Sequence, residues 1–569
     1  MKNITVFLCT CFDEINRVVD YNRLRSHLSD DPRVAAVMVA RGLCGSGGAE
    51  EIAASVKDGD DGRVLVAACS PLGRGDQLMR DLDRLGVPPF RRQLVDLREG
   101  CAWIHANNAA AATEKALDLL NMGLTALEHK EPSEDVTVKI AREVLVVGAG
   151  PAGMAAATAL ARCGIDVRVL ERGAQPGGML GLVSRSYPDN ADPSEKIAAF
   201  RDMAVSDPHI TFHPRAKIMS ARGYAGNFTV RFTTDGEELQ VNAGAVIIAT
   251  GGRGFPPKGY YRYGEIQEIV SQIELEARFR KGPVKKENAL FIQCVGARCE
   301  ERPYCSTICC PASIKNAMRV MDENKNARAW ILHRDIMMPG TTLEAYYKKA
   351  MERGVRFIRY AESDPPRILG DGSIEAVEVR DDVTGDKRTI PADLVVLSTP
   401  LIAGTDAAAI GDLFGIQRDK YGFFREIYPL HPVETRVDGV YICGSARWPV
   451  SSEQAMVQGE AAAMKATALV GRHTVRASEF SRVPGPKFGH ARVNENTCSG
   501  CGNCAAVCPF DAIRLQRRNE AGGYRMVSRV IKVRCKACGN CLSVCPNGSM
   551  QMPEMNTKSL YGMVGRAFS

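Results

Sequence analysis

Eight of the twenty cysteines lie near the C-terminal end of the chain, in two copies of one spacing. Each copy has three cysteines at intervals of three residues and a fourth cysteine four residues later, followed by proline. The two copies are Cys498, Cys501, Cys504 and Cys508, and Cys535, Cys538, Cys541 and Cys545. In such a run three thiolates bind one iron–sulfur cube and the fourth binds the other. The spacing therefore predicts two 4Fe-4S clusters, one held by Cys498, Cys501, Cys504 and Cys545, and the other by Cys535, Cys538, Cys541 and Cys508.

A pair of structural zinc knuckles is the alternative interpretation of these cysteines. Zinc sites usually take four ligands in two close pairs and do not repeat a Cys-Pro step. Because the run occurs twice with identical spacing, we expect cubane clusters, and with them electron transfer.

A strand, a glycine turn, a helix and a second strand follow one another in the middle of the chain. The strand at 144–147 enters a turn that contains Gly148, Gly150 and Gly153, and the strand at 166–170 ends at Glu171. The first glycine permits the tight turn, the second lets the backbone approach a pyrophosphate, and the third lets the helix pack on the strand. The acid can take the ribose hydroxyls. This unit predicts a bound dinucleotide.

Two further segments support FAD rather than NAD, the alternative for the glycine turn alone. They are the run at 176–179 and the strand at 245–249 that enters the glycines at 251 and 252. With these segments, residues 143 to 470 resemble the two-dinucleotide-domain flavoproteins of the thioredoxin-reductase-like class, and the segment 438–444 fits the closing strand of that class. The resemblance implies further FAD contacts at Pro151, Ala152, Arg172, Gly178, Met179, Thr250, Gly251 and Gly444.

The second nucleotide-binding half departs from this pattern. After the strand at 289–293, where a glycine turn for NAD(P)H is expected, the chain has five cysteines: Cys294, Cys299, Cys305, Cys309 and Cys310. A bulky turn leaves little room for a nicotinamide dinucleotide, so we expect electrons from another donor. The cysteines are open to three interpretations: cluster ligands, a redox thiol pair or simple burial. We interpret Lys315 as a lysine on a solvated helix face and His333 as a strand-end residue.

The first 130 residues alternate strands and helices, which predicts a small parallel sheet with helices on both faces. The strands are expected near 4–8, 35–40, 63–68 and 93–97, and a long helix from 105 to about 128. Five cysteines follow or end these strands and so fall on one rim of the sheet, where ligands bind. They predict a third iron–sulfur cluster held by Cys44, Cys69, Cys101 and either Cys9 or Cys11.

The length of 569 residues predicts three or four domains, and the formal net charge of +7 is mild and spread along the chain. Nucleic acid is therefore not an expected partner, whereas acidic redox partners are favoured. No export signal and no apolar span are evident, so membrane association is expected only through partners. Free cysteines in cluster spacing indicate a reducing, cytoplasmic location.

Over nearly its whole length the chain resembles the A-type subunits of heterodisulfide reductases and their relatives in quinone-linked and sulfur metabolism. The segments that carry this resemblance are Cys9-x-Cys11, 68–71, 98–105, 301–310, 334–336, 346–347, 354–358 and the double ferredoxin run. The resemblance implies an oxidoreductase with FAD and several clusters. The resemblance also implies that the chain acts with other redox subunits. These partners are heterodisulfide reductase B/C-like subunits or hydrogenase-, dehydrogenase- or quinone-linked subunits. Flavin-based bifurcation is in doubt, because segment 445–453 departs from the expected form and no ferredoxin insert lies between Gly178 and Phe291.

The expected fold class is α/β, with a C-terminal bacterial-type two-cluster ferredoxin domain of α+β type. The expected domains are 1–135, 140–480 with its second half at 288–400, 488–555 and a tail at 556–569. Two rival functions are a self-sufficient NAD(P)H-dependent oxidoreductase, similar to the small subunit of glutamate synthase, and a non-catalytic cluster-bearing scaffold or redox sensor.

Overall fold

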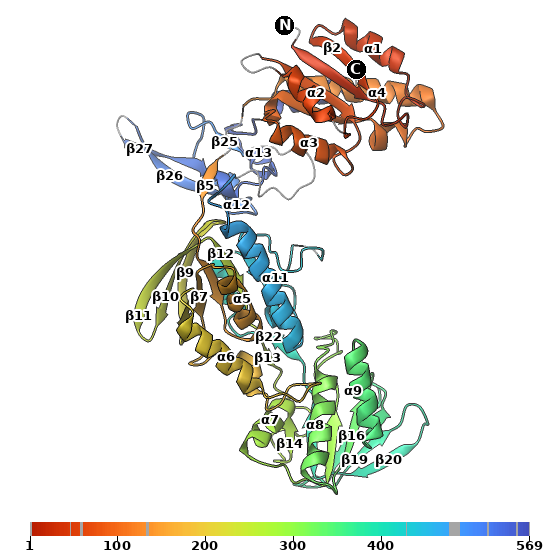
Figure 1. Ribbon diagram of the computed structural model, residues 1–569, viewed down its shortest axis with the longest axis vertical. Helices are drawn as coiled ribbons and strands as arrows, with labels where there is room; N and C mark the ends of the chain where they lie inside the picture. Colours follow the sequence, from red (N-terminus) through yellow and green to blue (C-terminus); the bar gives the residue numbers. More distant parts are fainter. Residues whose placement is uncertain are drawn as a thin grey trace. The chain divides into compact units, whose positions relative to one another are not determined.

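The computed structural model describes residues 3–45, 47–56, 61–132, 136–427, 429–476, 490–520, 523–553 and 556–567 (Figure 1). The chain divides into two compact units, each described here by itself. One unit combines Met1–Val138 with Val475–Ser569, and the other is Lys139–Thr474. No helix within the described ranges is both long and apolar enough to cross a membrane.

The N-terminal part of the first unit is a four-stranded parallel sheet in the order β2-β1-β3-β4. Its strands are β1 (Ile4–Cys9), β2 (Val34–Ala40), β3 (Arg63–Ala68) and β4 (Arg92–Asp96). Its helices are α1 (Tyr21–Asp30), α2 (Gly48–Ser55), α3 (Gly75–Arg84) and α4 (Ala109–Glu128). Chain direction across the sheet reverses after β2, so right-handed crossovers place α1 on one face and α2 and α3 on the other. The predicted sheet is confirmed, while the long helix begins at Ala109 rather than 105.

The C-terminal part of the same unit is built from short elements around its cysteines. The helices are α12 (Asn503–Ala506), α13 (Asn540–Ser543) and α14 (Thr557–Ala567), and the strands are β25 (Arg492–Val493), β26 (Ile513–Glu520), β27 (Gly523–Val530) and β28 (Met550–Gln551). Strands β26 and β27 form an antiparallel hairpin, and β25 pairs with β28. Helix α14 packs on α4, where a Cβ added at Gly562 would lie 2.7 Å from the Thr125 side chain.

The first half of the second unit has a five-stranded parallel sheet in the order β23-β12-β6-β7-β8. Its strands are β6 (Val144–Val147), β7 (Val167–Leu170), β8 (Ile210–His213), β12 (Ala245–Ile248) and β23 (Val440–Ile442). Its helices are α5 (Pro151–Arg162), α6 (Pro193–Ser206), α10 (Ala407–Phe414) and α11 (Ser452–Val470). A three-stranded antiparallel sheet of β9 (Lys217–Tyr224), β10 (Asn227–Thr234) and β11 (Glu237–Ala243) completes it.

The second half of this unit repeats the same plan. Its parallel sheet has the order β14-β21-β15-β16-β17, with β14 (Ile269–Ser271), β15 (Asn288–Ile292), β16 (Arg328–His333), β17 (Arg356–Arg359) and β21 (Leu394–Leu397). The helices are α7 (Gln272–Lys281), α8 (Cys309–Glu323) and α9 (Thr341–Glu352), and the antiparallel sheet contains β18 (Arg367–Leu369), β19 (Ala376–Arg380) and β20 (Lys387–Pro391). Strands β13 (Gly252–Gly254) and β22 (Leu401–Ala403) pair where the chain passes between the halves. Two halves with the topology of dinucleotide-binding domains are therefore present, as predicted.

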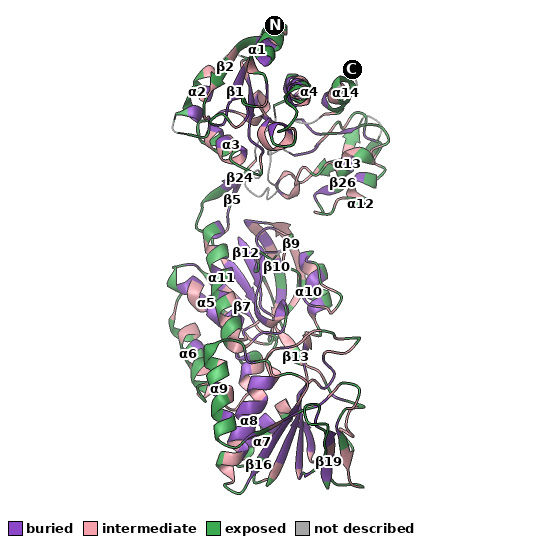
Figure 2. Ribbon diagram, turned by 90° about the vertical axis from the view of Figure 1, so that its right-hand side faces the viewer, coloured by how far each residue is buried: buried purple, intermediate pink, exposed green. Residues whose placement is uncertain are grey.

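The parallel strands form the cores of both units, as Figure 2 shows by their burial. Strands β6, β12, β15 and β21 are almost entirely apolar because both faces of each parallel sheet are covered, one by helices and the other by the three-stranded antiparallel sheet of the same half. Such sheets leave their carboxyl ends free for chemistry, and most of the candidate site residues lie at those ends. Two short strands, β5 (Thr137–Lys139) and β24 (Thr474–Arg476), lie where the chain enters and leaves the second unit.

Candidate redox sites

Four cysteines line one pocket in the C-terminal part of the first unit. Three belong to the first run, Cys498, Cys501 and Cys504, and the fourth is Cys545 of the second run. The fold thus brings together, from across the sequence, the four thiols that the spacing assigns to one cluster. Ser499, Ser528, Ser549 and Met550 complete the lining.

The second set of thiols is also gathered. Charge on Cys535, Cys538 and Cys508 acts on Cys541, whose pKa is raised to about 12, mainly by burial and then by these neighbours. Cys508 likewise lies near enough to Cys535 to raise its pKa, after the larger effect of burial. The cysteine before proline in the first run therefore lies beside the second run.

The two cysteine runs adopt matching backbone geometry. Gly502 and Gly539 have φ of +83° and +81° and begin the short helices α12 and α13. Both positions need the left-handed conformation that glycine adopts without strain. The Ala512 and Ser549 N–H groups donate to the sulfurs of Cys508 and Cys545 at 3.3 and 3.2 Å, each four residues after its cysteine. Hydrogen bonds of this kind stabilise thiolates and tune cluster potentials.

Ser528 is a neighbour of the first set of cysteines that sequence reasoning missed. It lies on β27, is 2% exposed, and its hydroxyl is 3.1 Å from the Cys504 sulfur. Its N–H donates to the Cys498 sulfur at 3.4 Å. Nothing in the sequence marks this serine, because only the pairing of β27 with β26 turns it toward the cysteines.

No group of three or more His, Cys, Asp or Glu side chains that could hold a single metal ion occurs among the residues described. The thiolates of a cubane bind four different irons, so they lie farther apart than the ligands of one ion. The pocket lined by Cys498, Cys501, Cys504 and Cys545 supplies the four thiols that one cluster requires.

The glycine turn after β6 has the close contacts that the fingerprint predicts. A Cβ on Gly153 would lie 1.8 Å from the Gly148 carbonyl oxygen, and Gly148 itself has φ of +102°. A Cβ on Gly150 would meet no atom within 4 Å, so open space faces this residue. Gly150 is the N-cap of α5 and gives its first N–H groups no side-chain acceptor, which suits a phosphate. These residues fit the pyrophosphate of FAD.

The other predicted FAD contacts surround this turn. A Cβ on Gly178 would lie 3.1 Å from the Cα of Gly150, and a Cβ on Gly444 would lie 2.9 Å from the Ala152 side chain. Thr250 and Gly251 follow β12, which pairs with β6, while Met179 lies in the turn η3 (Gly178–Leu182). Pro151 is the first residue of α5.

The two charged residues after β7 make contacts within the protein. The Glu171 carboxylate accepts hydrogen bonds from the N–H groups of Ala149 and Gly173 at 2.7 and 2.6 Å. It therefore lies directly beside the glycine turn, within reach of a ribose there. Arg172 is exposed and forms an ion pair with Asp406 at 3.4 Å.

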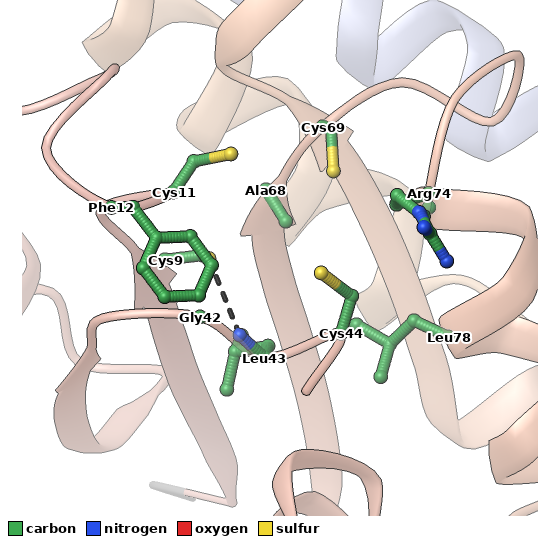
Figure 3. Close-up of a pocket in the computed structure, with 11 residues that line it drawn as sticks. Cys9, Cys11, Phe12, Gly42, Leu43, Cys44, Ala68, Cys69, Arg74 and Leu78 are labelled. Atoms are coloured by element: carbon green, nitrogen blue, oxygen red, sulfur yellow. Dashed lines mark hydrogen bonds between the residues drawn. The ribbon is translucent and has the colours of Figure 1, made fainter. Parts of the chain in front are cut away.

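Four of the five N-terminal cysteines line a second cavity (Figure 3). Cys9 ends β1, Cys11 follows it, Cys44 follows β2 and Cys69 follows β3. Figure 3 shows the sulfurs of Cys44 and Cys69 directed toward each other. In a sheet of this strand order the crevice between β1 and β3 is the topological switch point, the usual ligand site of an open α/β sheet.

Cys101 is not among the residues that line this cavity. It is fully buried in the short π-helix η2 (Arg98–Ala102), and its thiol donates a hydrogen bond to the Ala112 carbonyl oxygen at 3.2 Å. Arg98, in the same turn as Cys101, contacts a cysteine of the cavity instead. Its guanidinium donates a hydrogen bond to the Cys11 sulfur at 3.0 Å. Burial raises the pKa of Cys69 to about 11, against the opposing effect of Arg98.

Strained backbone holds the N-terminal cavity open. Cys11, Phe12 and Asp13 have φ of +51°, +54° and +73°, a run of left-handed residues without glycine. Each costs about 1–2 kcal/mol relative to ordinary backbone. Such strain is typical of functional sites, and here it turns Cys11 back toward the end of β3.

The turn after β15 leaves no glycine cradle for a second dinucleotide. Gly296 occupies its middle, and a Cβ there would lie 2.4 Å from the Phe255 ring. The Arg302 guanidinium covers the same ring at 4.3 Å and donates to the Gly296 carbonyl oxygen. Phe255 and Arg302 thus pack on the turn where a glycine motif for NAD(P)H is expected, and the use of another electron donor stays a prediction.

Four cysteines of this segment lie close together at the start of α8. Burial raises the pKa of Cys309 well above its ordinary value, and charge on Cys310, Cys294 and Cys305 raises it further. Cys299 instead contacts Glu301, with its sulfur 3.2 Å from the carboxylate. The grouping is compatible with all three interpretations: cluster ligands, redox thiols and simple burial.

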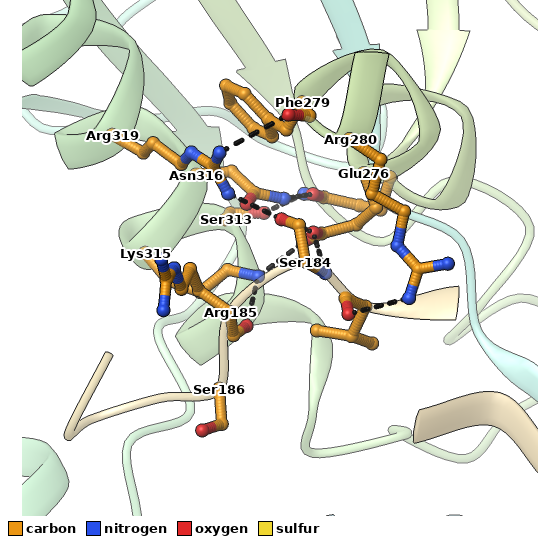
Figure 4. Close-up of polar contacts among 12 residues, drawn as sticks. Ser184, Arg185, Ser186, Glu276, Phe279, Arg280, Ser313, Lys315, Asn316 and Arg319 are labelled. Carbon is orange, nitrogen blue, oxygen red and sulfur yellow. Dashed lines mark hydrogen bonds and ion pairs between the residues drawn. The ribbon is translucent and has the colours of Figure 1, made fainter. Parts of the chain in front are cut away.

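The prediction that Lys315 lies on a solvated face is wrong. Lys315 is 3% exposed and forms an ion pair with Glu276, which is equally buried (Figure 4). The same carboxylate accepts from the N–H of Ser184 at 2.9 Å, and Lys315 also donates to the Arg185 carbonyl oxygen at 2.8 Å. The ion pair thus ties α7 and α8 to the segment that leaves η3. His333 does end β16, and burial lowers its pKa to about 4.

Two known families match parts of the chain. Residues 142–291 match the pyridine nucleotide-disulphide oxidoreductase family, and residues 488–558 match the 4Fe-4S dicluster domain. Together with the observed topology, these matches confirm the predicted fold class.

Curated relatives match almost the whole chain. The iron-sulfur A1 subunit of the CoB–CoM heterodisulfide reductase of Methanopyrus kandleri is 29% identical over 91% of this chain and 91% of its own. The A-type subunit of the H2/formate:CoB-CoM heterodisulfide,ferredoxin reductase of Methanococcus maripaludis is 28% identical, again over 91% of both chains. A solved thioredoxin reductase from T. acidophilum covers 58% of this chain and 99% of its own at 22% identity, with a TM-score of 0.41.

Proposed function

We propose, from the premise that the chain is an iron–sulfur flavoprotein of the heterodisulfide reductase A type, that it relays electrons between partner subunits through FAD and 4Fe-4S clusters. The chain is an oxidoreductase with a flavoprotein fold and a dicluster ferredoxin domain. Its specific place in a complex, and its exchange of electrons with other subunits, are part of the proposal.

One observation carries the proposal: a single cavity is lined by Cys498, Cys501, Cys504 and the distant Cys545. Three cysteines from one run and the last from the other are what a two-cubane ferredoxin requires. A non-catalytic scaffold with a vestigial flavin site requires neither these four gathered thiols nor the open glycine turn at Gly150.

FAD supplies the link between two-electron and one-electron transfer when it is bound. We assign its pyrophosphate to the turn with Gly148, Gly150 and Gly153, and its ribose to Glu171. The remaining assigned contacts are Pro151, Ala152, Arg172, Gly178, Met179, Thr250, Gly251 and Gly444. The two C-terminal clusters keep the ligand sets that the spacing predicts.

We assign the third cluster to Cys9, Cys11, Cys44 and Cys69. This set replaces Cys101 with the second cysteine of the opening pair. The support is the cavity that these four residues line and the hydrogen bond that engages Cys101 elsewhere. The cysteines at 294, 305, 309 and 310 remain candidates for a fourth.

The assembly and the location are proposed on the same basis. The relatives are named as A-type subunits of heterodisulfide reductases, some of which are named for hydrogen, formate or ferredoxin as well. For this chain we propose redox partner subunits and a cytoplasmic location, with domains at 1–135, 140–480, 488–555 and 556–569. Bifurcation at the flavin is a further step that needs its own test.

Anaerobic purification, followed by counting flavin, iron and acid-labile sulfide, tests this function. The proposal predicts one FAD with about twelve irons, since each cubane holds four irons. About sixteen irons would add a cluster at the cysteines around Cys309. Neither NADH nor NADPH should bleach the flavin. Rapid bleaching by either nucleotide would favour the self-sufficient oxidoreductase, and absence of flavin would favour the scaffold.

A further inference from the structure

The hairpin of β26 and β27 carries an unusual concentration of positive charge. It contains five arginines and one carboxylate, Glu520, so it supplies more than half of the chain's formal net charge of +7. The arginines are Arg514, Arg517, Arg518, Arg525 and Arg529. Charge concentrated on a small surface attracts partners of opposite sign and steers their approach.

Two arginine pairs lie directly opposite one another across the hairpin. Arg514 pairs in register with Arg529, and Arg518 pairs with Arg525. Like charges directly opposite each other on one face of an antiparallel pair are destabilising. A two-stranded hairpin is marginally stable by itself, so folding gives no reason for these pairs.

Two of the arginines have no carboxylate partner among the residues that the structure describes. The Arg529 guanidinium donates only to the amide oxygen of Gln516, at 3.2 Å. Arg517 lies over the Tyr524 ring at 4.6 Å, and this ring is 59% exposed. Arg514, in contrast, pairs with Asp511 and Arg518 with Glu495. Because side chains alternate between the two faces of a strand, Arg517 and Arg529 lie on opposite faces, and each face of the hairpin presents one of these cations.

This surface lies directly over the first group of C-terminal cysteines. Ser528 on the hairpin contacts Cys504 at 3.1 Å, and Arg525 donates to the Cys498 carbonyl oxygen at 2.5 Å. On the face of the hairpin that carries Arg517, the exposed side chains of Leu515 and Tyr524 add apolar area. Apolar contacts with a charged rim are typical of protein interfaces. A nucleic acid or a lipid headgroup would gain nothing from this proximity, whereas an electron carrier would.

We propose that the hairpin is the docking surface for an acidic electron-transfer protein, such as a carboxylate-rich ferredoxin. This inference rests on the proposed relay. One electron passes in each encounter: the carrier is oxidised by one electron, and the site of Cys498, Cys501, Cys504 and Cys545 is reduced by one. No atom or proton needs to move between the proteins.

The test uses the full-length, cluster-loaded protein and an acidic two-cluster ferredoxin. Binding of the oxidised ferredoxin is measured by titration calorimetry at several salt concentrations, which requires no electron transfer. Reduction by the reduced ferredoxin is then followed by stopped flow. The double variant Arg517→Gln/Arg529→Gln breaks no ion pair, and it should weaken binding and slow reduction about tenfold at low salt.

Arg222→Gln/Arg328→Gln is the matched control, because it removes from the other unit two exposed arginines that form no ion pair with the residues described. A third variant, Arg529→Glu, separates docking from folding. It places a carboxylate opposite Arg514, so it should stabilise the hairpin while weakening ferredoxin binding further.

Binding that is insensitive to salt, or equal in the hairpin variant and in the control, would overturn the proposal. So would arginine-dependent binding to DNA or to anionic vesicles with ferredoxin binding unchanged. Photoreduced deazaflavin, a small reductant that needs no docking, tests the relay separately. If it fails to reduce the clusters, the proposed function fails, and not only the docking surface.

Discussion

Lys315 and Glu276 form an ion pair between two side chains that are both about 3% exposed. Burial raises the pKa of Glu276. The charge and the hydrogen bond of Lys315, together with the hydrogen bonds from Ser184, outweigh this effect and leave the pKa below its ordinary value. The carboxylate therefore remains ionised beside its lysine. The pair connects α7 and α8 of the second half with the segment that follows η3. The first residue of η3, Gly178, lies beside the glycine turn.

Removal of either partner leaves an uncompensated buried charge, so Glu276→Gln should destabilise the flavin unit by about 3–5 kcal/mol. The measurement is urea-induced unfolding followed by flavin fluorescence. Lys315→Met combined with Glu276→Leu should recover most of this loss. Glu344→Gln, in the exposed pair with Lys348, is the control and should change stability by less than about 1 kcal/mol. Equal losses in both pairs would contradict the buried arrangement.

Gly150 and Gly153 separate the FAD contact from the fold. Gly150→Ala meets no protein atom within 4 Å, so it should leave unfolding unchanged and weaken FAD binding at least tenfold. Gly153→Ala places a Cβ 1.8 Å from the Gly148 carbonyl oxygen and should destabilise the unit itself. FAD titration of the apoprotein, with circular dichroism, distinguishes the two. Unchanged FAD affinity in Gly150→Ala would move the pyrophosphate elsewhere.

Substitution of Cys501 and Cys538 tests whether the cofactors are held independently. The double variant Cys501→Ala/Cys538→Ala removes one ligand from each C-terminal set, so it should lose about eight irons and retain FAD. Iron analysis and the visible spectrum check this expectation. Loss of the flavin in the same variant would argue against modular binding.

Cys69 and Cys101 should behave differently in the N-terminal domain. Cys69→Ser removes a side chain that lines the cavity and should lose about four irons, whereas Cys101→Ser should keep them. The Cys69→Ser protein is compared with the parent by electron paramagnetic resonance after reduction. Loss of iron from Cys101→Ser with retention in Cys69→Ser would reverse the ligand assignment.

Ser528 should tune the potential of the cluster at Cys498, Cys501, Cys504 and Cys545. Its hydroxyl stabilises charge on the Cys504 sulfur, so Ser528→Ala should lower the midpoint potential by about 40 mV, equivalent to a hydrogen bond of about 1 kcal/mol. Redox titration measures the shift. Ser499→Ala, which changes an exposed serine on the same cavity, is the control. A matching shift in that control would remove the role of the hydrogen bond.

The sequence by itself determined the chemistry and the order of the elements. Eight cysteines at fixed spacing predict two cubanes because the spacing of ligands along a short turn sets which irons they can reach. The glycines at 148, 150 and 153 predict a bound dinucleotide because each stands where the turn leaves no room for a side chain. The alternation of apolar strands and helices predicts the parallel sheets, because the periodicity of neighbouring residues identifies each strand and helix.

Only the tertiary structure decided which distant side chains meet. It placed Cys9 and Cys11, but not Cys101, on the N-terminal cavity, through a turn of left-handed residues and a π-helical turn that periodicity does not reveal. It buried Lys315 against Glu276, two residues on different helices, and it brought Ser528 to Cys504 through the register of a hairpin. The same register set Arg514 opposite Arg529. Such contacts depend on packing between elements, which the order of residues along the chain does not specify.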